Sequence, residues 1–297
     1  MMRKSDDLYC FLILHYLTLD DTVRCIESIE SNFNENYKIV VVDNGSNNNT
    51  GDKLLNKYKN DSNVKVILNK ENMGFSGGNN VGIKYIEEKI KPDFIIMINN
   101  DTYFTQKDFL KKITSCYDKY KFAVLGPKII LKNNQVFIMH YKLRSKKEIR
   151  SNMRYIRICR LLNFLNLYNF LGRIKRKYKK QSNNVNDKKN NKIKLNVVLH
   201  GCCLIFSRKY LDLFNDLNNK TFLYGEEELL YIRLMNNKLI SIYNPDLEIH
   251  HNEDGSTNAQ KIKSRQKNEF VFRHQLLANK AILDEINNVG ESIYEFK

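Results

Sequence analysis

Two aspartates in the first half of the chain stand directly after apolar runs that predict buried strands. Asp43 follows the run Lys38–Val42 and opens the turn sequence Asp-Asn-Gly-Ser, and Asp101 closes the sequence Asn-Asn-Asp after Phe94–Ile98. At Asp43 such a carboxylate can accept hydrogen bonds from a base or a ribose, and at Asp101 its oxygens suit Mg²⁺ or Mn²⁺. Each residue also has a plainer interpretation, Asp43 in an ordinary turn and Asp101 as the N-cap of a following helix.

A stretch rich in glycine and asparagine, Asn72–Asn80, lies between the two aspartates and reads Asn-Met-Gly-Phe-Ser-Gly-Gly-Asn-Asn. Its glycines let the backbone approach a ligand closely and leave amides free to face phosphate. The helix predicted from Val81 onwards has an N-terminus that favours an anion. The stretch is not a GxGxxG motif and follows the third predicted strand, so it is not a dinucleotide fingerprint. The alternative interpretation is a flexible loop.

The second half of the chain contains three adjacent carboxylates and a pair of histidines. Glu226, Glu227 and Glu228 stand at the predicted start of a helix. One of them could face a cleft as a general base, or all three could simply complement the helix dipole. His250 and His251 end a predicted strand, where a histidine can ligate a metal or hold a phosphate. Since adjacent residues of a strand face opposite ways, we expect at most one of them to enter a site.

These residues need a scaffold that gathers the ends of several strands. Apolar runs of strand length alternate with windows of helical spacing, which predicts a mostly parallel α/β sheet with helices on both faces. Ligands bind such sheets at the carboxyl ends of the strands, where the polar loops lie. The predicted strands are Leu8–His15, Lys38–Val42, Val64–Leu68, Phe94–Ile98, two within Phe122–Met139, Asn196–Phe206, Leu239–Tyr243 and Leu247–His250, and the predicted helices are Asp20–Phe33, a short one around Leu54–Tyr58, Val81–Ile90, Glu226–Asn236 and Lys261–Glu285.

The segment Lys142–Lys194 differs from the rest of the chain in its charge. It contains eighteen basic and two acidic residues, a net charge of +16 that equals the formal net charge of the whole chain. An apolar stripe flanked by arginines predicts either a helix lying on an anionic membrane or a helix packed on the core with a solvated basic tail. The stripe comprises Tyr155, Ile156, Ile158, Leu161, Leu162, Phe164, Leu165 and Leu167, with Arg154, Arg157 and Arg160 beside it.

The composition suits one large α/β domain. The 297 residues, 42% of them hydrophobic, are enough for a sizeable core. Six cysteines without a CxxC pair or zinc-finger spacing predict reduced thiols in a cytoplasmic protein. The first apolar run is too short for a signal peptide, and no run of about 18 apolar residues predicts a spanning helix. We therefore expect a cytoplasmic protein whose membrane contact is at most peripheral, on the inner face of the cell membrane.

The motifs of the first half resemble, in order, those of the family 2 glycosyltransferases of the GT-A fold. Asp43–Ser46 resembles the family's nucleotide-contacting turn. Asn72–Asn80 is similar to its Asn-x-Gly-Phe-Ala-Gly-Gly-Asn-Asn stretch, in the version typical of rhamnosyltransferase-like members. Asn99–Asp101 matches the position of its DxD motif, with Asp101 as the retained carboxylate.

The resemblance continues in the second half and covers Leu8 to about Met139 and Asn196 to about Lys280. Phe222–Glu227 resembles the family's Phe-Tyr-Gly-Glu-Asp motif, ahead of a helix that carries an arginine, here Arg233. His251 followed by Gly255–Thr257 is similar to its late histidine followed by Gly-Ser.

The resemblance implies an inverting transfer of a sugar from a nucleotide-diphosphate donor to a glycan or lipid-linked acceptor, in cell-surface polysaccharide biosynthesis, with Mn²⁺ or Mg²⁺. It implies a GT-A (Rossmann-like) domain in which residues 1–141 bind the nucleotide sugar, residues 142–195 form a basic insertion, and residues 196–297 form the acceptor half and the C-terminal helix. The implied roles are catalysis by Glu227 or Glu226, donor binding by Asp43, Asn72, Gly74, Asn79, Asn100 and Asp101, and metal binding by Asp101 and His251.

Three features depart from the family pattern: Asn99 replaces the first DxD carboxylate, Glu227 replaces an aspartate, and the basic segment is additional. Two other classes of protein stay open. A nucleic-acid-binding protein is indicated by charge alone, without an RNP, KH or zinc motif, and we expect no nucleic acid as partner. A nucleotidyltransferase would also use a carboxylate-bound metal. It would normally have a phosphate-binding loop after the first strand, where this chain has His15–Thr18.

Overall fold

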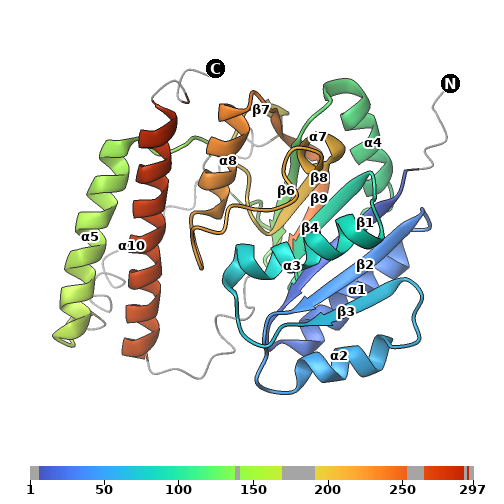
Figure 1. Cartoon of the computed structure of the whole chain (residues 1–297), viewed down its shortest axis with the longest axis horizontal. Coiled ribbons are helices and arrows are strands. Elements are labelled where there is room, and N and C mark those ends of the chain that lie inside the picture. Colours follow the sequence, from blue (N-terminus) through green and yellow to red (C-terminus); the bar gives the residue numbers. More distant parts are fainter. Residues whose placement is uncertain (1–6, 138–140, 169–190, 253–263, 291–292, 294–297) are drawn as a thin grey trace.

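One mixed sheet draws its strands from both halves of the chain. The structure is a computed structural model that describes residues 7–137, 141–168, 191–252, 264–290 and 293. Within these residues nine strands form the order β3-β2-β1-β4-β8-β6-β9-β5, with β7 beside β9 (Figure 1). The strands are β1 (Tyr9–His15), β2 (Tyr37–Asp43), β3 (Val64–Leu68), β4 (Phe94–Asn99), β5 (Thr102–Tyr103), β6 (Val124–Leu131), β7 (Lys194–Leu195), β8 (Cys203–Ser207) and β9 (Ser241–His251).

The first half of the sheet is parallel, as the sequence predicted. β1 pairs in parallel with β2 and with β4, and β2 pairs in parallel with β3. β8 runs antiparallel between β4 and β6, and β6 pairs in parallel with β9. The chain that follows the basic segment therefore enters the middle of the sheet and shares its core.

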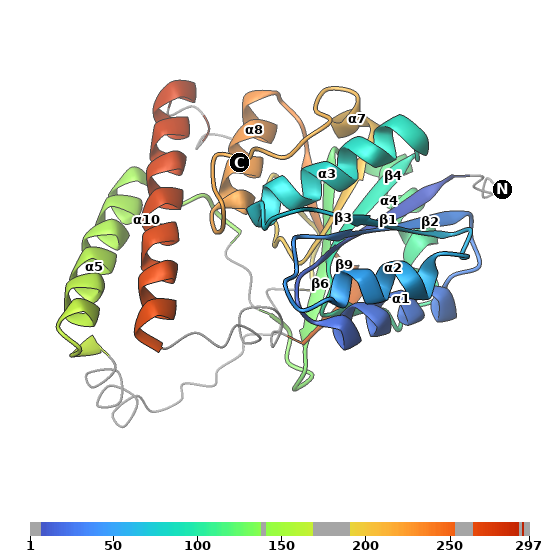
Figure 2. The same ribbon diagram turned by 60° about the horizontal axis from the view of Figure 1, so that its bottom comes forward.

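Helices cover both faces of the sheet because side chains alternate along each strand. Phe11 of β1 stacks on Phe33 at the end of α1, with 5.6 Å between ring centroids, whereas Leu12 lies against Gly82 of α3 on the other face. Figure 2 shows α3 on one side of the sheet and α1 and α2 on the other. The helices are α1 (Leu19–Asn32), α2 (Thr50–Tyr58), α3 (Gly74–Lys89), α4 (Phe109–Tyr120), α5 (Lys146–Phe164), α7 (Arg208–Leu211), α8 (Glu226–Asn236) and α10 (Ser264–Val289).

The predicted start of the third helix is wrong, and the error concerns the glycine-rich stretch. α3 begins at Gly74 rather than at Val81, so most of the stretch forms the first turns of a helix and not a loop. The glycines give the helix close access to the sheet. A Cβ on Gly78 would lie 2.6 Å from Cδ1 of Leu14, and one on Gly82 would lie 2.2 Å from Cδ1 of Leu12.

Strand predictions in the second half of the chain are also partly wrong. Of the predicted strand Asn196–Phe206, only β8, from Cys203, is part of the sheet. The two strands predicted on either side of Pro245 form the single strand β9. The pairing of β9 with β6 shifts its register after Pro127 of β6, and this irregularity accommodates Pro245 within β9. The second strand predicted within Phe122–Met139 forms one bridge, between Ile130 and Val136, among the described residues, and its last positions, 138 and 139, lie outside them.

The basic segment supplies α5, which packs along α10 to form a helical pair beside the sheet (Figure 1). Ser145 and Glu148 form a capping box at the start of α5. Ile156 and Cys159 of α5 share a small apolar cluster with Phe272 of α10. One side of the predicted apolar stripe thus packs against a partner helix. Within the described ranges, no helix combines the length and apolar character that crossing a bilayer requires.

Candidate active site

The carboxyl ends of β1, β2 and β4 lie side by side, and the polar loops predicted to carry function start from them. His15 at the end of β1 pairs in register with Asp43 of β2, and Leu14 pairs with Asn99 of β4. The turn after Asp43 and the Asn-Asn-Asp loop therefore begin at the same edge of the sheet, which is where open α/β sheets bind ligands.

Asp43 is held at this edge by the turn that follows it. Its carboxylate oxygens accept the backbone N–H of Ser46 at 3.2 and 3.3 Å. Burial raises the pKa of Asp43, and the hydrogen bonds from Ser46 act in the opposite direction. Gly51 at the start of α2 leaves room for the carboxylate, because a Cβ there would lie 2.2 Å from its Oδ2. The result is a carboxylate that is fixed in place and largely buried.

Asn44, the next residue, attaches the glycine-rich stretch to the same edge. Its Nδ2 donates to Oδ1 of Asn72 and to the carbonyl of Gly74, both at 3.0 Å. Its Oδ1 accepts the N–H of Met73 at 3.0 Å. The amides of Met73, Gly74 and Phe75 all donate within the protein, so the expectation that the stretch leaves its amides free for phosphate is wrong at these three positions.

The donor-binding candidates in this stretch occupy different environments. Asn72 and Gly74 belong to the network around Asn44, and Gly74 has a φ of 76° with its Cα close to the carbonyl of Phe222. Asn79 is fully buried inside α3, where its Nδ2 donates to the carbonyl of Phe75. Its Oδ1 has no hydrogen-bond partner among the described residues.

A buried histidine links the Asp43 turn to the Asn-Asn-Asp loop. His15 contacts the hydroxyls of Thr22 and Thr50 at 2.7 and 2.9 Å, and its Nε2 lies 3.9 Å from Oδ1 of Asp43. Asn100 donates from Nδ2 to Oγ1 of Thr22 at 2.9 Å. Because burial lowers the pKa of His15 to about 4, the ring is neutral and works as a hydrogen-bonding bridge.

Asp101 and His251 form the pair of metal-ligand candidates, and the structure brings them together. Nε2 of His251 lies 3.1 Å from Oδ1 of Asp101, and both side chains are about nine-tenths buried. Their loops meet because β5 pairs with the end of β9. His250 faces away and stacks on Tyr103, so only one histidine of the pair enters the site, as expected from strand geometry.

This pair fits a cation that takes only part of its coordination from the protein. Within the described chain, no group of three or more His, Cys, Asp or Glu side chains could hold a metal. Nδ1 of His251 is buried without a hydrogen-bond partner in the same residues, so the ring has an uncommitted polar atom. Mg²⁺-type sites often use one or two carboxylates and complete their shell with substrate phosphates and water. Asp101 and His251 meet that requirement.

His200 joins the metal-ligand pair to the carboxylates of α8. Its ring lies 6.2 Å from that of His251, centroid to centroid, and its Nδ1 accepts the N–H of Cys202 at 3.0 Å. Burial lowers its pKa to about 4, and the nearby His251 adds to the effect. The next residue, Gly201, donates its N–H to Oε1 of Glu227 at 3.2 Å. A continuous path of contacts therefore runs from Asp101 to Glu227.

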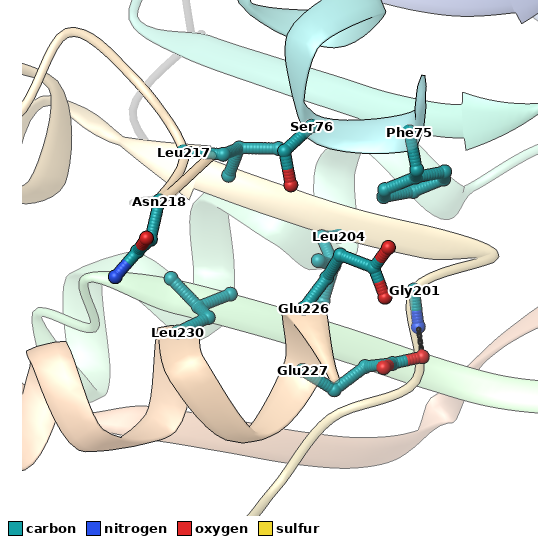
Figure 3. A pocket seen from close by; sticks show the side chains of 9 residues that line it. All are labelled: Phe75, Ser76, Gly201, Leu204, Leu217, Asn218, Glu226, Glu227 and Leu230. Atoms are coloured by element: carbon teal, nitrogen blue, oxygen red, sulfur yellow. Dashed lines mark hydrogen bonds between the residues drawn. The ribbon is translucent and has the colours of Figure 1, made fainter. Parts of the chain in front are cut away.

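Glu226 and Glu227 line a small pocket between α8 and the first turn of α3 (Figure 3). The Glu226 carboxylate points towards Phe75, and the Glu227 carboxylate points to Gly201. Burial, followed by the negative charge of Glu227, raises the pKa of Glu226 to about 8. Burial also raises the pKa of Glu227, against the hydrogen bond from Gly201. The pair therefore shares at least one proton near neutral pH and can act in proton transfer.

Unpartnered polar atoms concentrate around these residues. Within the described residues, six buried side-chain oxygen or nitrogen atoms lack a hydrogen-bond partner. Four of them belong to site residues or to the pocket: Ser76 Oγ, Asn79 Oδ1, Glu226 Oε1 and His251 Nδ1. Buried polar atoms are normally paired, so each of these four atoms is a candidate contact for a ligand or for a bound water.

Other residues singled out in the sequence have structural contacts or lie elsewhere. Glu228 pairs with Arg144 and is not directed at the pocket. Arg233 of α8 binds Asp216 and the hydroxyl of Tyr210, and so fixes the loop before α8. Gly255–Thr257 lie outside the described residues.

Sequence reasoning missed two residues of the site, His15 and His200. The sequence predicts His15 as the last residue of the first strand and the first of the following loop, without a role in the site. The signal that could have found it is its position opposite Asp43 in parallel strands of equal length. His200 gave no comparable signal, because it lies in an irregular segment and reaches the site only through the antiparallel strand β8.

Comparisons with known proteins agree with this arrangement. The family "Glycosyl transferase family 2" matches residues 10–214. The chain is 25% identical over 125 residues to the low-salt glycan biosynthesis hexosyltransferase Agl10 of Haloferax volcanii, a match that covers 42% of this chain and 37% of that protein. The chain thus spans well under half the length of this curated relative.

Two solved structures share the fold at low sequence identity. S. aureus TarS 1–349 in complex with UDP-GlcNAc has a TM-score of 0.54 and 14% identity, over 94% of this chain and 66% of that one. The mannosyltransferase PcManGT from Pyrobaculum calidifontis, in complex with GDP-Man and Mn²⁺, has a TM-score of 0.53 and 10% identity, over 97% and 77%. The mixed α/β sheet is that of the GT-A glycosyltransferases, and with a family match over more than half of its length, this chain belongs to glycosyl transferase family 2.

Proposed function

We propose that the protein is an inverting glycosyltransferase that moves a hexose from a nucleotide-diphosphate donor to a hydroxyl of a glycan or lipid-linked acceptor. The cellular role we propose is cell-surface polysaccharide biosynthesis in the cytoplasm. The observation that carries the proposal is the path of contacts from Asp43 through His15, Thr22 and Asn100 into the loop of Asp101, and on to Glu227. The name of the Haloferax relative, a hexosyltransferase of glycan biosynthesis, supports the reaction class.

The donor is assigned to the edge formed by β1, β2 and β4. Asp43 is buried, fixed and positioned to accept hydrogen bonds from a base or ribose. Asn72, Gly74 and Asn100 shape the same edge through Asn44 and Thr22, and Asn79 offers an unpaired oxygen. Donors named with the structural neighbours are UDP-GlcNAc and GDP-Man, which supports a nucleotide sugar as the ligand. Rhamnose is one sugar to include in the test.

Asp101 and His251 are proposed to hold a divalent cation. Two neighbours, PcManGT and GalNAc-T7, are named with Mn²⁺. A bound Mn²⁺ or Mg²⁺ would supply Lewis-acid neutralisation of the charge on the leaving diphosphate. The protein contributes one carboxylate and one imidazole, with Asn99 in place of a second carboxylate. We therefore expect metal affinity to be low until the donor's phosphates complete the site.

Glu227 is proposed as the general base, with Glu226 beside it in the same pocket. One oxygen of Glu227 is occupied by the N–H of Gly201, which orients the carboxylate and leaves the second oxygen for the acceptor hydroxyl. Burial raises its pKa, so it is a stronger base than a solvated glutamate. It would take the hydroxyl proton as that oxygen attacks the anomeric carbon, while the nucleoside diphosphate leaves from the opposite face.

The first prediction concerns turnover by Glu227→Gln. Purified protein is incubated with UDP-, GDP- and dTDP-sugars, including dTDP-rhamnose, with Mn²⁺, and release of the nucleoside diphosphate is measured. We expect Glu227→Gln to lower kcat at least about 100-fold with little change in donor affinity, since the amide cannot accept the proton. Glu228→Gln, next in sequence but bound to Arg144, is the control and should retain most activity. Unchanged turnover in Glu227→Gln would refute its role as base.

A further inference from the structure

The outer face of α5 exposes an unusual concentration of large apolar side chains. Among the described residues, twelve large hydrophobic side chains are exposed, and six of them lie between positions 155 and 167. They are Tyr155, Ile158, Leu161, Phe164, Leu165 and Leu167. Isolated exposed apolar residues are ordinary on protein surfaces, whereas a contiguous group marks an interaction site.

The concentration follows from the way α5 packs. Ile156, Cys159 and Asn163 face α10 and are buried. Ile158, Leu161 and Leu165 follow the spacing i, i+3, i+7, which places them together on the opposite side of the helix. Ile158 is 58% exposed and Leu161 is 59% exposed. The helix therefore has two apolar faces. One packs against α10, and no described part of the chain covers the other.

Arginines surround this apolar face. In the described part of the chain, Arg154, Arg157 and Arg273 are exposed and form no ion pair. Arg160 is paired with Glu269. A groove between α5 and α10 is lined by four arginines together with Leu161, Phe164 and Phe270; the four are Arg157, Arg160, Arg265 and Arg273. Exposed apolar side chains and uncompensated positive charge thus occupy the same face.

We infer that this face of α5 and α10 is a docking surface for an anionic lipid bilayer. A bilayer surface offers an apolar layer of acyl chains beneath a layer of lipid phosphates. The apolar side chains of this face can enter the acyl layer while the neighbouring guanidinium groups contact the phosphates. Nucleic acid is the weaker fit. A phosphate backbone would use the arginines but would leave the leucines and isoleucine of the apolar face in water.

The docking surface is connected to the candidate active site by α10. Phe222, whose carbonyl binds the N–H of Phe75, packs its ring against Phe270 and His274 of α10. Gly225, directly before Glu226, lies against Ala278 and Ile282 of the same helix. Bilayer binding does not depend on the proposed sugar transfer, but these contacts would hold the carboxylates of α8 at a fixed distance from the membrane.

Sedimentation of the full chain with lipid vesicles tests the inference. Vesicles of phosphatidylcholine alone are compared with vesicles that also contain phosphatidylglycerol, and we expect binding to the mixed vesicles only. The double variant Ile158→Asn/Leu161→Asn should bind at least about tenfold more weakly, since two apolar side chains no longer leave water. Arg154→Gln/Arg157→Gln should weaken binding at least about fivefold at low salt.

Matched control variants test whether binding depends on this surface or only on exposed apolar side chains and positive charge anywhere on the protein. Leu213→Asn replaces an equally exposed leucine, 61% exposed, away from α5, and Lys53→Gln/Lys65→Gln removes two charges from the far end of the sheet. Both should bind as the unmodified chain does. Equal binding of the Ile158/Leu161 variant would overturn the inference. The inference would also be overturned if an oligonucleotide bound tightly, competed with the vesicles, and kept its affinity in the Ile158/Leu161 variant.

Discussion

At the scale of single residues, the site depends on carboxylates whose environment differs from water. Glu226 and Glu227 are adjacent at the start of α8, and their side chains share one small pocket. Burial raises the pKa of each glutamate, and a neighbouring negative charge adds to the effect, that of Glu227 at Glu226 and that of Glu228 at Glu227. A proton held by either carboxyl would lower the negative charge in the pocket. We propose that Glu227, whose carboxylate is oriented by the N–H of Gly201, is the one that transfers a proton.

The raised pKa of Glu226 predicts a pH-dependent loss of stability. Its folded-state pKa, about 8, lies above the usual value of 4.5. The stability that protonated Glu226 contributes is complete below its unfolded pKa and is lost as the pH rises towards about 8. Urea unfolding of the wild-type chain should therefore show a falling free energy of unfolding between pH about 5 and about 8.

Glu226→Gln should flatten this decline by an amount on the order of a few kcal/mol, because the amide does not ionise. Glu88→Gln, at an exposed position of α3, is the control and should leave the slope as it is in the wild type. If Glu226→Gln shows the same slope as the wild type, the carboxyl is not held in its protonated form.

The sequence was informative about residue types at strand ends and uninformative about contacts across strands. Asp43 and Asp101 could be named as candidates because each is a carboxylate directly after a buried run, whereas Glu227 was distinguished from Glu226 and Glu228 only by the resemblance to the family. The joining residues, His15 and His200, could not be assigned, because their contacts lie on elements distant in sequence, the helices α1 and α2 for His15 and the strand β9 for His200. Strand alternation alone did not show which histidine of the pair enters the site; the family resemblance implied His251, and the pairing of β9 with β5 brings this residue next to Asp101.

At the scale of elements, α3 shows why a glycine-rich sequence need not be a loop. Gly74 takes a positive φ against the carbonyl of Phe222, which begins the helix sharply. A Cβ placed on Gly78 would lie 2.9 Å from the side chain of Asn44. Asn44 in turn forms a hydrogen bond with Asn72 in the preceding stretch. The same residues that indicated a flexible phosphate loop instead let a helix pack directly on the sheet. Periodicity could not show this, because glycine gives no hydrophobic signal.

Gly78→Ala tests this packing. The new methyl group would meet Leu14 and the four-times hydrogen-bonded side chain of Asn44. We expect the free energy of unfolding to fall by about 1–3 kcal/mol through overpacking, which exceeds the gain of about 0.5–1 kcal/mol from better helix propensity. Donor binding should weaken as well, because the Asn44 network shifts.

Gly77→Ala is the matched control one residue earlier in the same helix. A Cβ at Gly77 would lie 3.0 Å from Cβ of Met73 and within 4 Å of no side chain of the sheet. Thermal or urea unfolding should therefore show Gly77→Ala as clearly less destabilised than Gly78→Ala. Equal destabilisation of both variants would contradict the explanation that position 78 requires a glycine because the helix approaches the sheet closely there.

At the scale of the whole molecule, the path of the chain after the basic segment determines whether the site is complete. Strand β8 enters antiparallel between β4 and β6, and this brings Gly201 and α8 to the edge that carries Asp43 and Asp101. The first four strands could be predicted within two residues at either end because each is a continuous apolar run. The position of β8 could not be predicted, since it depends on long-range pairing that one sequence does not record.

The basic segment likewise has two sides that only the whole fold distinguishes. The sequence indicated one apolar stripe and left open whether it faced a membrane or the core. The structure divides it, because Ile156 packs on Phe272 of α10 while Ile158 and Leu161 remain exposed. Packing against the rest of the fold is therefore confirmed for Ile156, whereas membrane contact by the exposed side chains stays a proposal.

The central claim is that Asp43, Asp101 and Glu227 surround one bound nucleotide sugar. Calorimetric titration with UDP, GDP and dTDP in the presence of Mn²⁺ measures this most directly. For the diphosphate that binds, we predict that Asp43→Asn and Asp101→Asn each weaken affinity at least about tenfold, and that Glu227→Gln leaves it unchanged. Removal of Mn²⁺ with a chelator should reproduce the Asp101→Asn result. Affinity that is the same in wild type, Asp43→Asn and Asp101→Asn would contradict the account.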